Sequence, residues 1–376
     1  MKDIKILRKD LDEIDKQIVS LMEKRYNISS EVAEYKIANS KKVYDKKRED
    51  EVILSRKNSL NNHKYDDFIA ELYEKIMEQS REIQLDMVNK NQKDEVIKED
   101  FVFHPKIAYC GVKGSYAYQG IGMLFKDEFD EVSTSSFEDA FLKIKENKSD
   151  YALIPIENSS TGSINDVYDL LFKYNFKICG EVKVKIDHAL IGKKGTDIKN
   201  LRKIYSHIQG LNQCEDFLNS LNYTEKIPFY NTAGAAKYVS ESDDYTIAAV
   251  ASKKTADIYG LEILKEDIST RKNNYTRFVL IAKNHIKIEN ADKISMAFTL
   301  SHTKGSLFKV LSVFAKENLN LVKIESRPCE DKNWEYLFFL DFIINEDTDI
   351  RNLLEKIRPM TKEMEYLGNY RSYFEK

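Results

Sequence analysis

The first 88 residues of this 376-residue chain contain neither glycine nor proline, the residues that most readily interrupt a helix. Cysteine is also scarce, with four in the chain and no two spaced as a CxxC pair. The six histidines do not cluster either, which argues against a zinc site or a disulfide framework. We therefore expect no metal, no other cofactor, and reduced thiols at Cys110, Cys179, Cys214 and Cys329.

Long apolar runs are missing as well. No stretch approaches the roughly 20 apolar residues that span a bilayer, and the N-terminal stretch is charged, without the apolar region of a signal peptide. The net charge of −3 gives no general attraction to nucleic acid or to an anionic membrane. Hydrophobic residues make up 42% of the chain, enough for real cores. We expect a cytoplasmic protein of two or three domains that binds neither nucleic acid nor membrane.

Residues 1–88 have the apolar spacing of a helical domain. Apolar residues recur every three or four positions from Ile4 to Tyr35. This pattern predicts a long first helix to about Asn39, a second helix over 46–58 and a third over 65–88.

Three polar residues occupy positions that this pattern reserves for apolar ones. They are Arg25 on the first helix, and Ser80 and Gln84 on the third, and they are joined by Lys36 on the first helix. A buried arginine is costly unless it is paired, so a lone one is usually exposed at a helix end. Arg25 and Lys36 are 11 residues apart, about 16 Å along one helix face. The set therefore favours an anion-binding pocket inside a helical bundle.

Arg8 lies 17 residues before Arg25, about 25 Å away on a straight helix. It can contribute to the same pocket only from a second subunit, which predicts an intertwined dimer. On the second helix Asp45, Arg48 and Glu49 form one polar patch, for which a solvated helix face is the ordinary alternative.

Segments 7–36, 43–49 (VYDKKRE) and 80–84 (SREIQ) resemble the helical chorismate mutase domain. Such an enzyme needs no nucleophile or metal for its Claisen rearrangement, only a constrained substrate and donors beside the ether oxygen. A non-catalytic dimerisation arm is the alternative, but it would have no use for Arg25 or Ser80 on its seam. The resemblance implies that Arg8 of a partner chain, Arg25 and Lys36 bind the carboxylates, Lys36 and Gln84 bind the ether oxygen, and Asp45, Arg48, Glu49 and Ser80 hold the ring hydroxyl and a carboxylate.

After a polar linker at 89–104, the composition changes at Pro105. Glycines appear, and short β-like runs alternate with helical patterns to about residue 284, which predicts α/β layers. Four motifs place hydroxyl, amide and backbone N–H groups at helix or strand ends, where anions bind well. Each motif alone would be an ordinary cap or turn. They are IPIENSSTGSINDVYDLL (154–171), YSHIQGLNQCEDFL (205–218), NTAGAAKYV (231–239) and NNYTRFVLIAK (273–283).

Together these motifs resemble prephenate dehydratase, over about residues 105–283. The resemblance implies two lobes like those of a periplasmic binding protein, with the active site in the cleft. It departs at Val112, where the family usually has proline, and at Ala117, where it usually has a hydroxyl residue. It implies Thr276 as the leading catalytic residue, Arg277 as a carboxylate binder, and a cleft lined by Glu157, Asn158, Ser159, Ser206, His207, Gln209, Thr232 and Ala233.

Residues 293–372 predict a strand–helix–strand–strand–helix–strand unit of the ferredoxin-like type. The segments KGSLFKVLSVFA, KIESRP and WEYLFFLDF resemble the phenylalanine-binding ACT domain attached to dehydratases. A plain dimerisation domain is the alternative. The resemblance implies phenylalanine as an effector, bound through Gly305, Ser306, Leu307, Glu325 and Ser326.

We therefore expect a bifunctional enzyme that converts chorismate to prephenate and prephenate to phenylpyruvate, inhibited by phenylalanine. Its assembly is expected to be a homodimer or a homotetramer. An amino-acid sensor without catalysis is another reading, disfavoured because the TRF sequence at 276–278 accompanies the other motifs.

Overall fold

The computed structural model describes residues 3–39, 41, 43–91, 99–126, 128–328, 336–345 and 348–374. The predictions for Cys329 and Trp334 lie outside these residues. The chain forms two compact units, of which the first comprises Met1–Glu95, Leu300–Asn318 and Asp347–Glu363. The second comprises Val96–Thr299, Leu319–Glu346 and Met364–Lys376.

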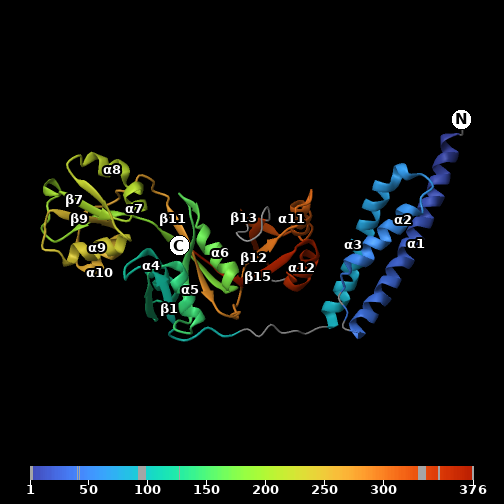
Figure 1. The fold of residues 1–376 in the computed structure, drawn as a ribbon, viewed down its shortest axis with the longest axis horizontal. Coiled ribbons are helices and arrows are strands. Elements are labelled where there is room, and N and C mark those ends of the chain that lie inside the picture. The colour runs from blue at the N-terminus through green and yellow to red at the C-terminus, as the bar shows by residue number, and fades with distance from the viewer. Residues whose placement is uncertain are drawn as a thin grey trace. The chain divides into compact units, whose positions relative to one another are not determined.

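Three helices form most of the first unit: α1 (Ile4–Ala38), α2 (Lys46–Asn58) and α3 (Asp66–Asn91) (Figure 1). Asp3 and Asp45 cap α1 and α2 by accepting hydrogen bonds from backbone N–H groups of the first turn. The three predicted helices are thus confirmed to within about three residues. The unit also contains η1 (His63–Tyr65), α11 (Ser306–Lys316), α12 (Ile350–Ile357) and η3 (Arg358–Met360).

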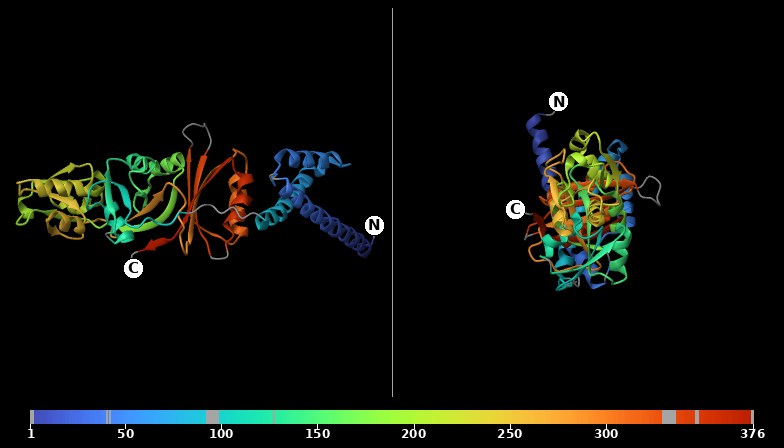
Figure 2. Two further views of the ribbon diagram at one scale, coloured as in Figure 1. Left: turned by 90° about the horizontal axis from the view of Figure 1, so that it is seen from below. Right: turned by 90° about the vertical axis from the view of Figure 1, so that its left-hand side faces the viewer.

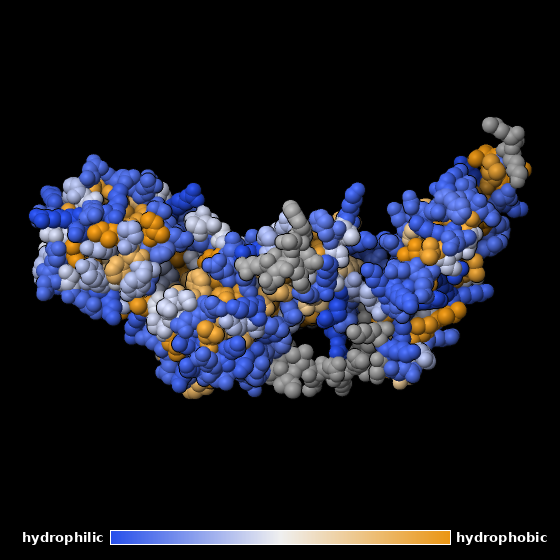
Figure 3. Space-filling view, in the orientation of Figure 1, coloured by the Kyte–Doolittle hydropathy of each residue, from blue (hydrophilic) through white to orange (hydrophobic). Residues whose placement is uncertain are grey.

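Much of the apolar stripe on α1 is not covered by the chain's own helices. Only Ser29 and Ala33 are buried on this helix. Figure 3 shows hydrophobic side chains on the surface of the helical segment. The large side chains that are 40–64% exposed are Ile4, Leu7, Leu11, Ile14, Ile18, Leu21 and Ile28.

The second unit begins with an α/β lobe built on a seven-stranded sheet. The strand order is β16-β5-β11-β3-β1-β2, with β4 paired to β3. Strands β1, β2 and β3 are parallel, whereas β11 runs antiparallel to both β3 and β5. The elements are β1 (Lys106–Cys110), α4 (Tyr116–Phe125), β2 (Asp130–Thr134), α5 (Phe137–Lys145), β3 (Tyr151–Asn158), β4 (Gly162–Ser163), α6 (Asn165–Tyr174), β5 (Lys177–Lys185), β11 (Tyr275–Ala282) and β16 (Ser372–Phe374).

A second lobe is inserted between β5 and β11 and has its own five-stranded sheet, in the order β10-β6-β9-β7-β8 (Figure 1, left). The chain therefore crosses between the lobes twice, through 186–188 and 266–274. This agrees with the two-lobed α/β prediction. The elements are β6 (Ala189–Gly192), η2 (Ile198–Asn200), β7 (Lys203–Ser206), α7 (Ile208–Gln213), α8 (Glu215–Ser220), β8 (Glu225–Pro228), α9 (Thr232–Glu241), β9 (Ile247–Ala251), α10 (Lys253–Tyr259) and β10 (Glu262–Lys265).

The C-terminal sheet has the strand order β13-β14-β12-β15. With α11 and α12, the order of elements along the chain is the predicted strand–helix–strand–strand–helix–strand, and the sheet order is that of a ferredoxin-like unit. The strands, seen next to the first lobe in Figure 2, are β12 (Lys293–Thr299), β13 (Asn320–Pro328), β14 (Tyr336–Ile343) and β15 (Glu363–Tyr370).

One face of this C-terminal sheet packs on the first lobe. Its residues Ala297, Leu337, Phe339 and Leu367 share a buried core with residues of β3, β11, α5 and α6. On β15, Gly368 has a φ of +140°, and a Cβ added there would lie 2.2 Å from the carbonyl oxygen of Ile178. Glycine is therefore required at this contact, which fixes the C-terminal sheet against strand β5.

Candidate active sites

The four seam residues of the helical segment come together between α1 and α3. Nη1 of Arg25 donates a hydrogen bond to Oγ of Ser80, and Nζ of Lys36 donates to Oε1 of Gln84 at 3.0 Å. Ser80 and Gln84 are buried, and both cations are partly buried. The two pairs bring the four predicted polar residues together between α1 and α3.

Lys36 is held by a second contact, because its Nζ also donates to the carbonyl oxygen of Val43 at 2.6 Å. Burial lowers the pKa of Lys36, and the nearby carboxylates of Asp45 and Glu49 offset only part of this effect. A desolvated ammonium group of this kind is a strong hydrogen-bond donor to an anionic ligand.

The predicted patch on α2 is divided among separate contacts. Asp45 caps the helix through the backbone N–H of Arg48, whose side chain is 70% exposed and lies 3.7 Å from Glu51. Glu49 lies 2.5 Å from Nη1 of Arg81. Arg81 was missed in the sequence, although it stands inside the SREIQ segment between Ser80 and Gln84.

Arg8 lies on the exposed part of α1. Helix α1 runs without a break from Ile4 to Ala38, so Arg8 is about 25 Å along the axis from Arg25. It therefore does not reach the pocket of its own chain.

The α/β segment places Asn158 and Thr276 side by side, at the paired ends of β3 and β11. Nδ2 of Asn158 donates to Oγ1 of Thr276 at 2.9 Å and to Oδ1 of Asn274 at 2.8 Å. Oδ1 of Asn158 accepts the backbone N–H groups of Ser160 and Thr161. Because Thr276 accepts from Asn158, its own hydroxyl proton remains for another acceptor. Ser159 closes the turn, accepting from the backbone N–H of Tyr275 at 2.9 Å.

Arg277 and Glu157 lie differently from the sequence prediction. Successive side chains of a strand point to opposite faces of the sheet, so Arg277 points away from Thr276. Its guanidinium contacts Glu181 at 2.6 Å and Asp341 at 2.7 Å, and Glu157 lies 3.0 Å from Lys323. This geometry corrects the expectation that Arg277 binds a substrate carboxylate. The guanidinium group is already paired with two carboxylates of the protein, those of Glu181 and Asp341. Glu157 likewise faces the C-terminal sheet and not a cleft beside Thr276.

The second lobe brings its motif residues together at the starts of α7 and α9. A Cβ added at Gly210 would lie 2.7 Å from Oγ of Ser206 and 3.2 Å from Cγ2 of Thr232. The motifs at 205–218 and 231–239 are therefore neighbours. Ser206 is fully buried and donates to the carbonyl oxygen of Val250 at 2.7 Å, which corrects its prediction as a lining residue.

His207, Gln209, Thr232 and Ala233 surround the same helix starts. His207 caps α7, its Nδ1 accepting the backbone N–H of Gln209, and burial lowers the pKa of its ring, so it is neutral near pH 7. Gln209 is exposed and Thr232 partly exposed, whereas Ala233 is fully buried and offers no side-chain surface to a ligand.

The first glycine turn leads from β1 into α4 in the first lobe. Ser115 caps α4 by accepting the backbone N–H of Tyr118. Ala117 is 6% exposed inside the first turn, so a methyl group fills this space. Gly111, at a φ of +120°, lies beside Asn231 of the second lobe.

The residues expected to bind an effector lie at two places in the fold. Gly305, with a φ of +78°, precedes α11, which starts with Ser306 and Leu307. Glu325 and Ser326 are neighbours on β13 and point to opposite faces. Oε2 of Glu325 accepts a hydrogen bond from Ser163 at 2.6 Å, whereas Ser326 is exposed.

Within the described part of the chain, no three His, Cys, Asp or Glu side chains are grouped so as to hold a metal ion. None of the helices described is long and apolar enough to cross a membrane.

A cluster of two cations, a hydroxyl and an amide between two helices, followed by two α/β lobes whose motifs present hydroxyl and amide groups, is what an enzyme for small anionic molecules requires. The model of the family Prephenate dehydratase matches residues 107–286, and that of Chorismate mutase type II matches residues 7–85.

Relatives match over nearly the full length. The bifunctional chorismate mutase/prephenate dehydratase of Buchnera aphidicola (from Acyrthosiphon pisum) is 34% identical, covering 98% of this chain and 96% of the relative. That of Escherichia coli K12 is 30% identical, covering 97% and 95%. The chain belongs to the family of bifunctional chorismate mutase/prephenate dehydratases. The crystal structure of the prephenate dehydratase from Staphylococcus aureus matches with a TM-score of 0.62 and 25% identity, over 71% of this chain and all of that one.

Proposed function

We propose that the two activities of this bifunctional enzyme reside in separate sites, with the rearrangement of chorismate between α1 and α3. The observation that carries this is the pair of contacts Arg25–Ser80 and Lys36–Gln84, which gathers cations and an amide in a buried seam. Arg25 and Lys36 would bind the carboxylates and hold the reactive conformer. Because Gln84 accepts from Lys36 with Oε1, its Nε2 is the atom able to donate to the ether oxygen as negative charge grows there.

The mutase pocket is proposed to be completed by a second chain. The uncovered apolar stripe on α1 supports this, and so does the distance of about 25 Å between Arg8 and Arg25. In an intertwined dimer the stripe would be buried, and Arg8 of the partner would supply the remaining cation. The ring hydroxyl and a carboxylate are proposed to be contacted by Asp45, Arg48 and Glu49. For Glu49 this requires that its ion pair with Arg81 break when the substrate binds.

Prephenate is proposed to react at Thr276. The bond to the ring carboxylate breaks and releases CO₂, its electron pair enters the ring, and the ring hydroxyl leaves after receiving a proton. The hydrogen bond from Asn158 supports Thr276 as the donor to this hydroxyl, because it leaves the threonine proton directed elsewhere. Ser159, His207, Gln209 and Thr232 are proposed to bind the side-chain carboxylate and carbonyl within a cleft between two lobes.

The C-terminal segment, residues 293–372, is proposed to be an ACT domain that binds phenylalanine. The sheet order and the left-handed glycine before α11 support this, since glycine there allows backbone N–H groups to approach a ligand closely. We propose boundaries of 1–88, 105–284 and 293–372 for the three domains, with a linker at 89–104. Phenylalanine must bind the less active state more tightly if it is to inhibit.

Purified full-length protein tests this function directly. Chorismate should disappear and phenylpyruvate should form, both followed spectroscopically, and added phenylalanine should slow the dehydratase step. A protein that binds phenylalanine but converts neither chorismate nor prephenate would instead be an amino-acid sensor. Conversion of prephenate alone would leave the helices as a dimerisation arm. A rate independent of phenylalanine, or calorimetry that detects no binding, would reject the effector role.

A further inference from the structure

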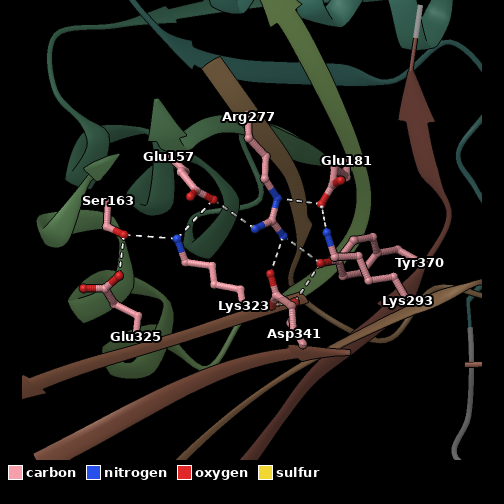
Figure 4. A network of polar contacts seen from close by, with 10 residues as sticks. Glu157, Ser163, Glu181, Arg277, Lys293, Lys323, Glu325, Asp341 and Tyr370 are labelled. Carbon is pink, nitrogen blue, oxygen red and sulfur yellow. Dashed lines mark hydrogen bonds and ion pairs between the residues drawn. The ribbon is translucent and has the colours of Figure 1, made fainter. Parts of the chain in front are cut away.

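A buried ion network joins Arg277 of strand β11 to the C-terminal sheet (Figure 4). Nε of Arg277 donates to Oε2 of Glu181 at 2.6 Å, and Nη2 lies 2.7 Å from Oδ2 of Asp341. Nη2 also donates to the hydroxyl of Tyr370 at 3.0 Å. Nζ of Lys293 completes the network, 2.8 Å from Oε2 of Glu181. All four charged residues are at most 6% exposed.

The network is balanced in charge and shared between two sheets. The first lobe supplies Arg277 and Glu181, and the C-terminal sheet supplies Lys293 and Asp341. Buried charges are tolerated only when they are paired, and removal of one partner leaves the other uncompensated. Each side chain of the network therefore depends on the other three for its position.

The charges are also persistent. Burial opposes the charged form of Arg277, but Asp341 and Glu181 outweigh it and raise the pKa of the guanidinium well above its usual range. Burial likewise opposes ionisation of Asp341, yet Arg277 and Lys293 hold its pKa below the usual value. Arg277 and Asp341 are thus both charged at neutral pH, as their contact at 2.7 Å requires.

A second contact links the same sheet to the partner strand of Thr276. Glu157 of β3 lies 3.0 Å from Nζ of Lys323 and 3.6 Å from Nη1 of Arg277. Glu157 directly precedes Asn158, and Arg277 directly follows Thr276. The hydrogen bond between Asn158 and Thr276 is therefore flanked on both strands by residues that are tied to the C-terminal sheet.

We propose that Asp341 and Lys293 are positioning residues for the dehydratase reaction, acting through Glu181 and Arg277 on Thr276. This rests on the proposed role of Thr276 as proton donor. The C-terminal sheet sets the angle at which the end of β11 presents the Thr276 hydroxyl. Displacement of a reacting group by about 1 Å lowers a rate by about 100-fold, so a small shift of Arg277 is enough to affect the reaction.

The test uses the full-length enzyme with Asp341→Asn, which keeps the shape of the side chain and removes its charge. The kcat for prephenate should fall about tenfold while KM stays within about twofold, because a positioned donor acts on the transition state. The mutase rate of the same protein should be unchanged, and its thermal unfolding curve serves as the control for folding of the unit that holds Asp341. Asp341→Glu, which retains the charge, should recover part of the lost kcat.

Asp169→Asn is the matched control. Asp169 of α6 pairs at 2.9 Å with Arg327 of β13, across the same interface but outside the network. The Asp169→Asn enzyme loses the same charge as Asp341→Asn and should retain the parental kcat for prephenate. A parental kcat in both Asp341 variants, or an equal fall in Asp169→Asn, would overturn the proposal.

The dehydratase rate of Thr276→Ala, measured in parallel, distinguishes the proposed role of Thr276 as proton donor from the positioning role of Asp341 and Lys293. If Thr276→Ala keeps the dehydratase rate, the role of Thr276 fails and the positioning proposal fails with it. If Thr276→Ala is inactive while both Asp341 variants retain kcat, only the positioning proposal fails. Should Asp341→Asn not fold, as its thermal unfolding curve would reveal, the comparison of Asp341→Glu with the parent decides the outcome.

Discussion

Ser80 and Gln84 lie about one turn apart on α3, and each accepts a hydrogen bond from a cation of α1. A dimerisation seam would place apolar side chains at these positions, since unpaired buried polar groups cost free energy. The four residues satisfy one another only in part, because Arg25 and Lys36 carry more donors than these acceptors use. The remaining donors suit a dicarboxylate.

The lowered pKa of Lys36 leads to a prediction about how the mutase reaction depends on pH. The ammonium form donates hydrogen bonds, so mutase kcat/KM should fall as pH rises through a pKa below the ordinary lysine value of 10.5. The pH–rate profile of the full-length enzyme measures this. Lys36→Arg should be slower near pH 7 but should lose this alkaline limb, because guanidinium stays charged. An identical limb in both proteins would assign the titration to another group.

Neighbouring residues of the same motif have different environments in the α/β segment. Thr276 and Arg277 are adjacent in sequence, and the two-residue periodicity of a strand implies that they face opposite sides of the sheet. Only the tertiary structure identifies the partners of Arg277, such as Glu181, which lies 96 positions away on β5. The sequence therefore identified the polar residues and not the groups that they contact.

At the scale of elements, the helices were the most predictable part. Regular apolar spacing and the absence of glycine and proline located α1, α2 and α3 to within about three residues. The C-terminal strands were also recognised, because they alternate with two amphipathic helices. The docking of β13 was not predictable, since Lys323, Glu325 and Arg327 read as ordinary charges of an edge strand. In the structure these three alternate residues meet Glu157, Ser163 and Asp169 of the first lobe.

The exposed stripe of α1 leads to a prediction about assembly. Ile14 is 52% exposed, and in the proposed dimer it would be buried. Ile14→Glu should therefore give monomers and lower the mutase rate by about 100-fold or more, because the partner's Arg8 is lost. Light scattering coupled to gel filtration measures the mass.

Lys16→Glu is the control for this variant, because it changes an exposed position about 200° around the helix from Ile14. It should leave both mass and mutase rate unchanged. An Ile14→Glu protein with the parental mass and mutase rate would contradict the dimer.

At the scale of the whole molecule, the sites proposed for the two activities use different polar groups in different parts of the chain. Residues 7–85 and 107–286 match separate families, and the Arg25–Ser80 and Lys36–Gln84 pairs lie in a different compact unit from Thr276. We therefore expect that each activity can be removed without the other. In the proposed regulation, the effect of phenylalanine would reach the dehydratase through the C-terminal sheet, whose contacts with β3, β5 and β11 lie beside the residues next to Thr276.

The most direct test is to assay Arg25→Ala and Thr276→Ala on each substrate separately. Arg25→Ala should lose mutase activity by about 100-fold or more and still form phenylpyruvate from prephenate at the parental rate. Thr276→Ala should convert chorismate normally and accumulate prephenate. Loss of both activities in either variant, or retention of both, would contradict two independent sites in one chain.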